Sequence, residues 1–132
     1  MKAKASSTRI ALVGLGRISK NHLGAIARLR GSFDLVAVCD LREEQFAKLS
    51  EFPMSPSRFA DYRSMLDDIR PDIVSLCTPS GLHPAHGMQA AERGIHVLTE
   101  KPMATTLEEA DRLIDCCHRN EVHLYVVKQN RL

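Results

Sequence analysis

Short apolar runs alternate with amphipathic helical patterns along almost the whole of this 132-residue chain. The expected strands are residues 8–13, 35–39, 58–60, 72–77, 96–100 and 123–128, and the expected helices are 17–29, 43–51, 61–68, 85–93 and 107–120. Because parallel strands need a crossover between them, this alternation predicts an α/β fold, a doubly wound parallel sheet covered by helices. In such folds, ligands bind in the crevice beyond the carboxyl ends of the strands.

A glycine pair follows the first expected strand directly. Gly14 allows a sharp turn, and Gly16 leaves room for a pyrophosphate to approach backbone amides at the start of the next helix. Arg17 and Ile18 continue this loop. Ser19 stands where the dinucleotide-binding pattern has its third glycine, and it is small enough to allow close packing of helix on strand.

Asp40 ends the second expected strand, at about the distance past the glycine loop where a ribose-binding acid is expected. The glycine turn and this acid together predict a dinucleotide-binding (Rossmann) domain. In the alternative interpretation the glycines form a simple turn, and Asp40 merely caps the helix entered at residues 41–43.

Composition limits the classes of function. With 44% hydrophobic residues the chain can bury one core, so we expect a polar tail at residues 1–8 and one domain at residues 9–132. The net charge is +2, and no basic run is interleaved with aromatic residues, which argues against a nucleic-acid partner. No apolar run approaches the roughly 20 residues that span a bilayer, so we expect no membrane partner.

The four cysteines have no C-x-x-C spacing and follow no secretory signal, which indicates reduced thiols in a cytoplasmic protein. We expect Cys39 and Cys77 to be small core residues, and one of the adjacent pair at positions 116 and 117 to face inward. His83 and His86 have a spacing that fits a metal, but no matching cysteine or carboxylate pair accompanies them, so no metal site is expected. The histidines at positions 22, 96, 118 and 123 form no recognisable constellation.

Polar and charged residues also follow the later strands, at positions 78–83, 100–102 and 128–131. Lys101 lies where the nicotinamide end of the crevice is expected. An ammonium there can hold a reacting hydroxyl by a hydrogen bond. If partial burial and neighbouring charge lower its pKa, the lysine can also exchange the proton that accompanies hydride transfer. The alternative is a solvated loop lysine that pairs with Glu100.

Four stretches, residues 13–19, 38–40, 78–83 and 100–110, carry a resemblance that covers almost the whole chain. They resemble the N-terminal domain of the glucose–fructose oxidoreductase/inositol dehydrogenase (Gfo/Idh/MocA) family, above all in Glu100-Lys101-Pro102. The resemblance implies that NAD or NADP accepts a hydride and that Lys101 is a catalytic residue in contact with substrate and nicotinamide. It also implies that the loop after the fourth strand lies against the cofactor.

On this basis we expect NAD as the cofactor. The residues expected to contact it are Gly14, Gly16, Arg17, Ile18, Asp40, Thr78, Pro79, Ser80, His83, Glu100, Lys101 and Gln129, and those expected to contact substrate are Lys101, Lys128 and Arg131. Family members carry a further C-terminal domain that supplies catalytic residues and the oligomer interface. That substrate domain is absent here, so we expect a homo-oligomer only for a full-length protein and no turnover by this domain alone.

A narrower resemblance lies in residues 16–22 and 125–131. They are similar to bacterial enzymes that oxidise the 3-hydroxyl of UDP-N-acetylglucosaminuronic acid in lipopolysaccharide O-antigen synthesis, which implies a small-molecule sugar-nucleotide substrate. Other functions stay open: a nucleotide-sensing module without chemistry, another polyol or sugar dehydrogenase, and an NAD-dependent glycosidase. A lysine at the nicotinamide end favours a dehydrogenase over a sensor.

Overall fold

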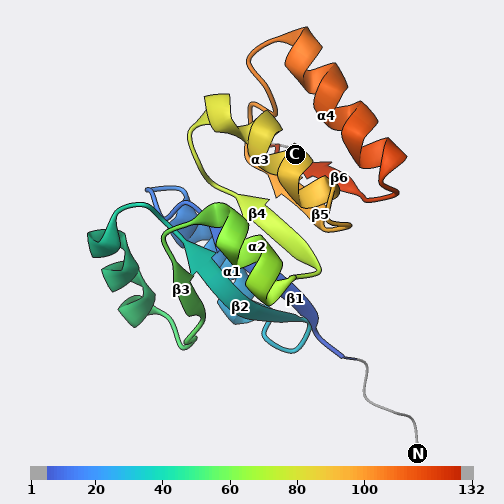
Figure 1. The fold of residues 1–132 in the computed structure, drawn as a ribbon. Helices are drawn as coiled ribbons and strands as arrows, with labels where there is room; N and C mark the ends of the chain where they lie inside the picture. Colours follow the sequence, from blue (N-terminus) through green and yellow to red (C-terminus); the bar gives the residue numbers. More distant parts are fainter. Residues whose placement is uncertain (1–5, 129–132) are drawn as a thin grey trace, which may run out of the picture.

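Within residues 6–128, which the computed structural model describes, six strands form one parallel sheet in the order β3-β2-β1-β4-β5-β6 (Figure 1). The strands are β1 (Thr8–Val13), β2 (Phe33–Cys39), β3 (Ser57–Phe59), β4 (Ile73–Leu76), β5 (His96–Thr99) and β6 (Leu124–Val126). This is the strand order of the Rossmann fold. The predicted doubly wound α/β fold is therefore confirmed.

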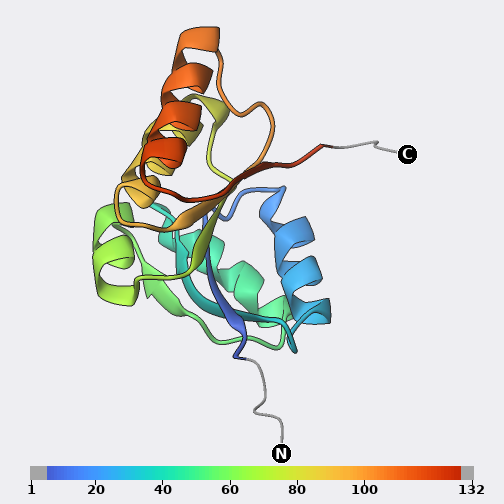
Figure 2. The ribbon, with the colours of Figure 1, turned by 90° about the vertical axis from the view of Figure 1, so that its right-hand side faces the viewer.

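Helices cover both faces of the sheet (Figures 1 and 2). One face carries α1 (Ser19–Arg28) and the 3₁₀ helix η1 (Glu43–Glu51), and the other carries α2 (Tyr62–Ile69), α3 (His83–Ala91) and α4 (Leu107–Arg119), with the short 3₁₀ helix η2 (Ser80–Leu82) leading into α3. From the β1/β4 boundary, successive strands are added outward in opposite directions, β1 to β3 on one side and β4 to β6 on the other. Right-handed crossovers therefore place the helices of the two halves on opposite faces.

Each face of the sheet has its own hydrophobic core. In β1, Ile10 and Leu12 pack with side chains of α1 and η1, whereas Ala11 and Val13 pack with side chains of α2, α3 and α4. Because β1 is covered on both faces, its sequence is continuously apolar instead of alternating. The central strands are thus rigidly held, and their carboxyl ends are fixed relative to one another.

Some element boundaries differ from the sequence-based prediction by a few residues. Helix α1 begins at Ser19 instead of residue 17, because the residues before it form a turn in which Ser19 Oγ donates to the Gly16 carbonyl (2.6 Å). Helix α3 begins at His83, two residues earlier than expected, since Pro84 fits the first turn of a helix. The segment at residues 43–51 is helical as predicted but of the 3₁₀ type.

Helix α4 begins and packs in a way that its sequence partly predicts. Thr106 Oγ1 accepts a hydrogen bond from the backbone N–H of Glu109 (3.1 Å) and so caps the helix, which begins at Leu107 as predicted. Cys116 and Cys117 are both 2% exposed, so the prediction that only one of them faces inward is wrong. Both adjacent positions lie in the broad apolar stripe that α4 turns toward α3 and the sheet.

Candidate functional site

The glycine turn after β1 lies against the exit of β4. Gly14 has a φ of +87°, and a Cβ atom on it would lie 2.9 Å from the backbone of Cys77 and Thr78. Both the positive φ and this close approach therefore require glycine. A Cβ atom on Gly16 would meet no protein atom within 4 Å, so packing does not explain this glycine. Open space there supports the expectation that it leaves room for a pyrophosphate.

Asp40 connects the ends of β1 and β2. Its Oδ2 atom accepts the backbone N–H of Leu15, and its Oδ1 atom accepts that of Arg42, both at 2.8 Å. Helix η1 (Glu43–Glu51) has Arg42 as its N-cap and no side-chain capping bond, so the alternative interpretation, in which Asp40 caps this helix, is wrong. The bond to Arg42 instead closes the turn before the helix. Each carboxylate oxygen keeps a further lone pair that a ribose hydroxyl could use.

Lys48 of η1 also holds the glycine turn, since its Nζ atom donates to the carbonyl of Leu15. The sequence analysis did not identify this residue. Its position in the helix after Asp40 gives only a weak signal, because the contact joins residues 33 positions apart. In the turn itself, Ser19 is fully buried and Ile18 half-buried, whereas Arg17 is exposed. The small residue at position 19 thus allows the close helix packing that was expected.

The loop after β4 contains Thr78, Pro79 and Ser80, which lie at least partly exposed at the carboxyl edge. His83, by contrast, is 1% exposed. Its Nε2 atom lies 2.6 Å from the Thr78 carbonyl oxygen, and its Nδ1 atom lies 3.0 Å from the carbonyl oxygen of Pro102. The imidazole therefore joins two loops of the crevice, and its buried side chain offers no surface to a cofactor.

The Glu100-Lys101-Pro102 segment follows β5. Lys101 is exposed, whereas Glu100 is only 7% exposed. Glu100 Oε1 lies 2.7 Å from His22 Nε2, and Glu100 Oε2 accepts the backbone N–H of Lys101 (3.3 Å). Among the described residues, the Glu100 carboxylate thus contacts the side chain of His22 and not that of Lys101, which disagrees with the alternative of a lysine–glutamate pair in a solvated loop. The peptide bond between Lys101 and Pro102 is cis.

His22 is a site residue that the sequence analysis missed, and the statement that it forms no constellation is wrong. From α1, it bridges Glu100 and Ser75 of β4, whose Oγ atom lies 2.9 Å from His22 Nδ1. His96 and His123 also form a pair, with stacked rings 5.1 Å apart. No local signal could reveal these pairs, because 78 residues separate His22 from Glu100.

The remaining predicted site residues lie toward the end of the chain. Lys128, which follows β6, is exposed. Gln129 and Arg131 lie outside the described residues. Of the three positively charged residues expected to contact the substrate, the described part of the chain therefore includes Lys101 and Lys128.

Burial decides the chemistry of the cysteines and of one further histidine. Burial raises the pKa of Cys39 to about 11 and that of Cys77 to about 12, so both thiols stay protonated and behave as small core residues, as predicted. Burial also lowers the pKa of His86, whose Nδ1 atom lies 3.4 Å from Thr78 Oγ1. Within residues 6–128, no group of three or more histidine, cysteine, aspartate or glutamate side chains could hold a metal ion.

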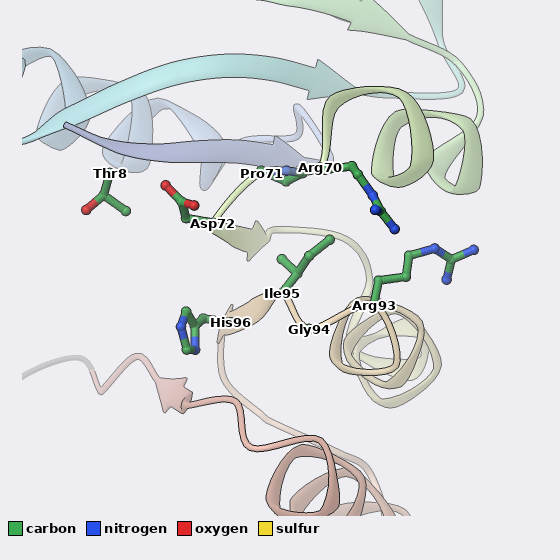
Figure 3. A pocket seen from close by; sticks show the side chains of 8 residues that line it. All are labelled: Thr8, Arg70, Pro71, Asp72, Arg93, Gly94, Ile95 and His96. Atoms are coloured by element: carbon green, nitrogen blue, oxygen red, sulfur yellow. The ribbon is translucent and has the colours of Figure 1, made fainter. Parts of the chain in front are cut away.

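A cavity lies away from the glycine turn, Asp40 and Lys101. This cavity of about 480 Å³ opens at the opposite edge of the sheet, where Thr8, Asp72 and His96 stand at or beside the amino ends of β1, β4 and β5 (Figure 3). Arg70 and Arg93 extend along its wall (Figure 3). This cavity is therefore not the site that the glycine turn and Lys101 define. No helix within residues 6–128 is long and apolar enough to cross a membrane.

A doubly wound parallel sheet with a glycine turn after β1 and an acid after β2 defines a dinucleotide-binding domain. The sequence matches, over residues 8–128, the oxidoreductase family with an NAD-binding Rossmann fold (Gfo/Idh/MocA). The chain therefore belongs to this family, as its motifs indicated.

Two solved structures and one further relative are similar to this chain. The WlbA dehydrogenase from Bordetella pertussis, in complex with NADH and UDP-GlcNAcA, is 42% identical with a TM-score of 0.89, over 96% of this chain and 39% of that chain. The WlbA dehydrogenase from Chromobacterium violaceum, with the same ligands, is 39% identical with a TM-score of 0.91, over 98% and 37%. D-glucoside 3-dehydrogenase of Escherichia coli is 36% identical over 114 residues, 86% of this chain and 32% of that protein. This chain thus spans well under half the length of each.

Proposed function

We propose that this chain is the cofactor-binding part of an NAD-dependent dehydrogenase that oxidises a sugar hydroxyl. The observation that carries the proposal is the exposed Lys101, which follows β5 at the carboxyl edge where the glycine turn and Asp40 also lie. Gly14, Gly16 and Asp40 would hold the pyrophosphate and a ribose. The bound NAD supplies the hydride acceptor.

In this proposal Lys101 acts on the hydroxyl that is oxidised. Its amine holds the hydroxyl oxygen by a hydrogen bond and takes up the hydroxyl proton as the carbon loses its hydride. The neighbouring loop of residues 78–80 would border the same space. A nucleotide sensor needs the glycine turn and the acid but not this lysine, and membership of an oxidoreductase family supports the dehydrogenase.

For the substrate we propose UDP-N-acetylglucosaminuronic acid, oxidised at its 3-hydroxyl, with a role in lipopolysaccharide O-antigen synthesis in the cytoplasm. The support is the likeness of residues 16–22 and 125–131 to such enzymes and the similarity to two dehydrogenases solved with UDP-GlcNAcA. Lys101 and Lys128, both exposed, suit an anionic sugar nucleotide. We further propose that the complete protein is a homo-oligomer.

A second candidate substrate is an uncharged glucoside, because one relative is a D-glucoside 3-dehydrogenase. The test uses the complete protein, including any sequence that follows this domain, and measures NADH formation. We expect activity on UDP-N-acetylglucosaminuronate to exceed that on UDP-N-acetylglucosamine, methyl glucoside and inositol. A preference for a neutral free sugar or polyol would refute the sugar-nucleotide substrate and leave the dehydrogenase intact.

The role of Lys101 is tested separately. Lys101→Ala is expected to lower kcat by about 10²–10⁴, the usual range for a positioned acid–base group, while the Kd for NAD stays nearly unchanged. Arg112→Ala, at an exposed position on α4, serves as the matched loss of a surface cation. Full activity of the Lys101 variant would mean that this lysine is an ordinary loop residue.

A further inference from the structure

The residues on either side of Lys101 are held by histidines from opposite layers of the fold. Glu100 pairs with His22 of α1, which covers one face of the sheet, and the Pro102 carbonyl pairs with His83, the first residue of α3 on the other face. Lys101 itself is exposed between these two anchors. The backbone that carries the lysine is therefore held from both sides, while its side chain is exposed.

The contact of His22 with Glu100 is a buried polar chain. The side chains of His22 and Glu100 are only 12% and 9% exposed, and Ser75, at the other ring nitrogen, is fully buried. A serine, a histidine and an acid in this order resemble a hydrolytic triad, but no substrate could reach Ser75. The chain therefore has an orienting function: Ser75 fixes the ring of His22, and the ring fixes the carboxylate.

Glu100 connects His22 directly to the backbone of Lys101. One carboxylate oxygen pairs with His22, and the other accepts the backbone N–H of Lys101. A buried carboxylate requires partners of this kind, because a charge without them is costly to remove from water. Loss of His22 would therefore release the carboxylate from α1 and, with it, the backbone of Lys101.

His83 acts on the other side of the lysine. Its ring lies between the carbonyl oxygens of Thr78 and Pro102, so it couples the loop after β4 to the loop after β5. These are the two loops that border the proposed nicotinamide end of the crevice. Beyond the pairing of β4 with β5, this side chain therefore helps to set the separation of the two loops and, with it, the distance from Lys101 to a bound cofactor.

We propose that His22 and His83 are positioning residues that align Lys101 for proton transfer. Neither touches the substrate in this proposal, since both act through the backbone next to the lysine. The inference rests on the proposed function, in which Lys101 is the catalytic residue. Misplacement of a reacting group by about 1 Å can cost about 100-fold in rate, so the two histidines are expected to affect turnover more than binding.

The test compares variants of the complete protein. For His22→Ala we expect kcat to fall about 10- to 100-fold, with the Kd for NAD and the KM for the sugar nearly unchanged. His22→Gln keeps an N–H donor and should recover part of the loss. Glu100→Ala removes both acceptor oxygens, so it should resemble His22→Ala, and the double variant should be no worse than either. His83→Ala should also lower kcat, and His118→Gln, at an exposed position, is the control.

Hydrogen–deuterium exchange of the Lys101 amide provides a readout that does not depend on activity. We expect faster exchange there in His22→Ala and Glu100→Ala, and unchanged exchange in the control. Unchanged exchange together with unchanged kcat in Glu100→Ala would overturn the inference even if His22→Ala failed to fold. If Lys101→Ala kept full activity, the proposed function of the lysine would fail, and the exchange data would still decide whether the two histidines hold its backbone.

Discussion

At the scale of single residues, the proposed cofactor end of the site consists of residues that also hold the protein together. Asp40 binds two backbone N–H groups and still has lone pairs for a ligand. The sequence predicted Gly14, Gly16 and Asp40 because each follows from a local turn or from spacing. It missed His22 and Lys48, because their partners are distant in sequence and are brought close only by the packing of α1 and η1 on the sheet.

Asp40 should make the domain prefer NAD to NADP. The 2′-phosphate of NADP would face its carboxylate as a like charge, and at about 4 Å this repulsion costs roughly 1–4 kcal/mol. Titration with both cofactors measures the preference. Arg42→Ala should widen it, since the guanidinium, 3.9 Å from Asp40, offsets part of the negative charge. Equal or tighter binding of NADP by the unmodified protein would disprove the prediction.

The two glycines of the turn should respond differently to alanine. Gly14→Ala places a Cβ at a positive φ and 2.9 Å from the backbone of β4 and its following loop, so we expect a loss of about 2 kcal/mol or more in the free energy of unfolding. Gly16→Ala, which meets no protein atom, should stay within about 0.5 kcal/mol but weaken NAD binding. Urea unfolding and NAD titration test both, and similar stability losses in the two variants would contradict this explanation.

At the scale of helices and strands, hydrophobic periodicity was a reliable guide. The order of the strands and of the longer helices was predicted, because most strands are short apolar runs and the helices show apolar spacing of three and four. The 3₁₀ helix η2 (Ser80–Leu82) was not predicted, and β3 (Ser57–Phe59) has only one apolar residue. The ends of elements were less accurate, since hydrogen bonds such as that of Ser19 to Gly16 determine them. The 3₁₀ geometry of η1 has no counterpart in the apolar pattern of residues 43–51.

The start of α4 provides a test at this scale. Thr106→Ala removes the acceptor for the backbone N–H of Glu109 and is expected to cost about 0.5–2 kcal/mol of stability. Thr105→Ala is the matched control, because the exposed Thr105 donates its side-chain hydrogen bond to the Glu109 side chain (3.2 Å) and not to the helix backbone. Denaturant midpoints of the two variants should differ, and a Thr105 variant as unstable as the Thr106 variant would argue against the capping role.

At the scale of the whole molecule, the sheet joins two cores that respond to pH through buried thiols. Burial raises the pKa of Cys39 to about 11 and of Cys77 to about 12, above the ordinary value of 9.0 that applies after unfolding. The folded state therefore binds more protons than the unfolded state at alkaline pH. The protonated thiols contribute to the free energy of unfolding, and this contribution is fully present below pH 9 and is lost as the pH rises toward 11. By pH 10 we expect a loss of about 1 kcal/mol for each thiol.

Denaturant unfolding at pH 7 and pH 10 measures this loss. Cys77→Ala should have a lower free energy of unfolding at both pH values. The difference between its values at pH 7 and pH 10 should be smaller than in the unmodified chain, because one ionisable thiol has been removed. An equal pH dependence in the variant and the unmodified chain would exclude this thiol as the cause.

The position of β1 between β2 and β4 also affects the order in which the strands associate during synthesis. β2 follows β1 closely, whereas Ile10 pairs with Ile73, more than sixty residues further along. On the ribosome, β1, α1 and β2 can associate first, since their contacts are local. Until residues 73–76 emerge, β1 remains an open edge strand, available to other chains. Synthesis of β4 therefore both closes this edge and brings the loop of Thr78 against Gly14, so that protection from aggregation and assembly of the nucleotide site are completed in the same step.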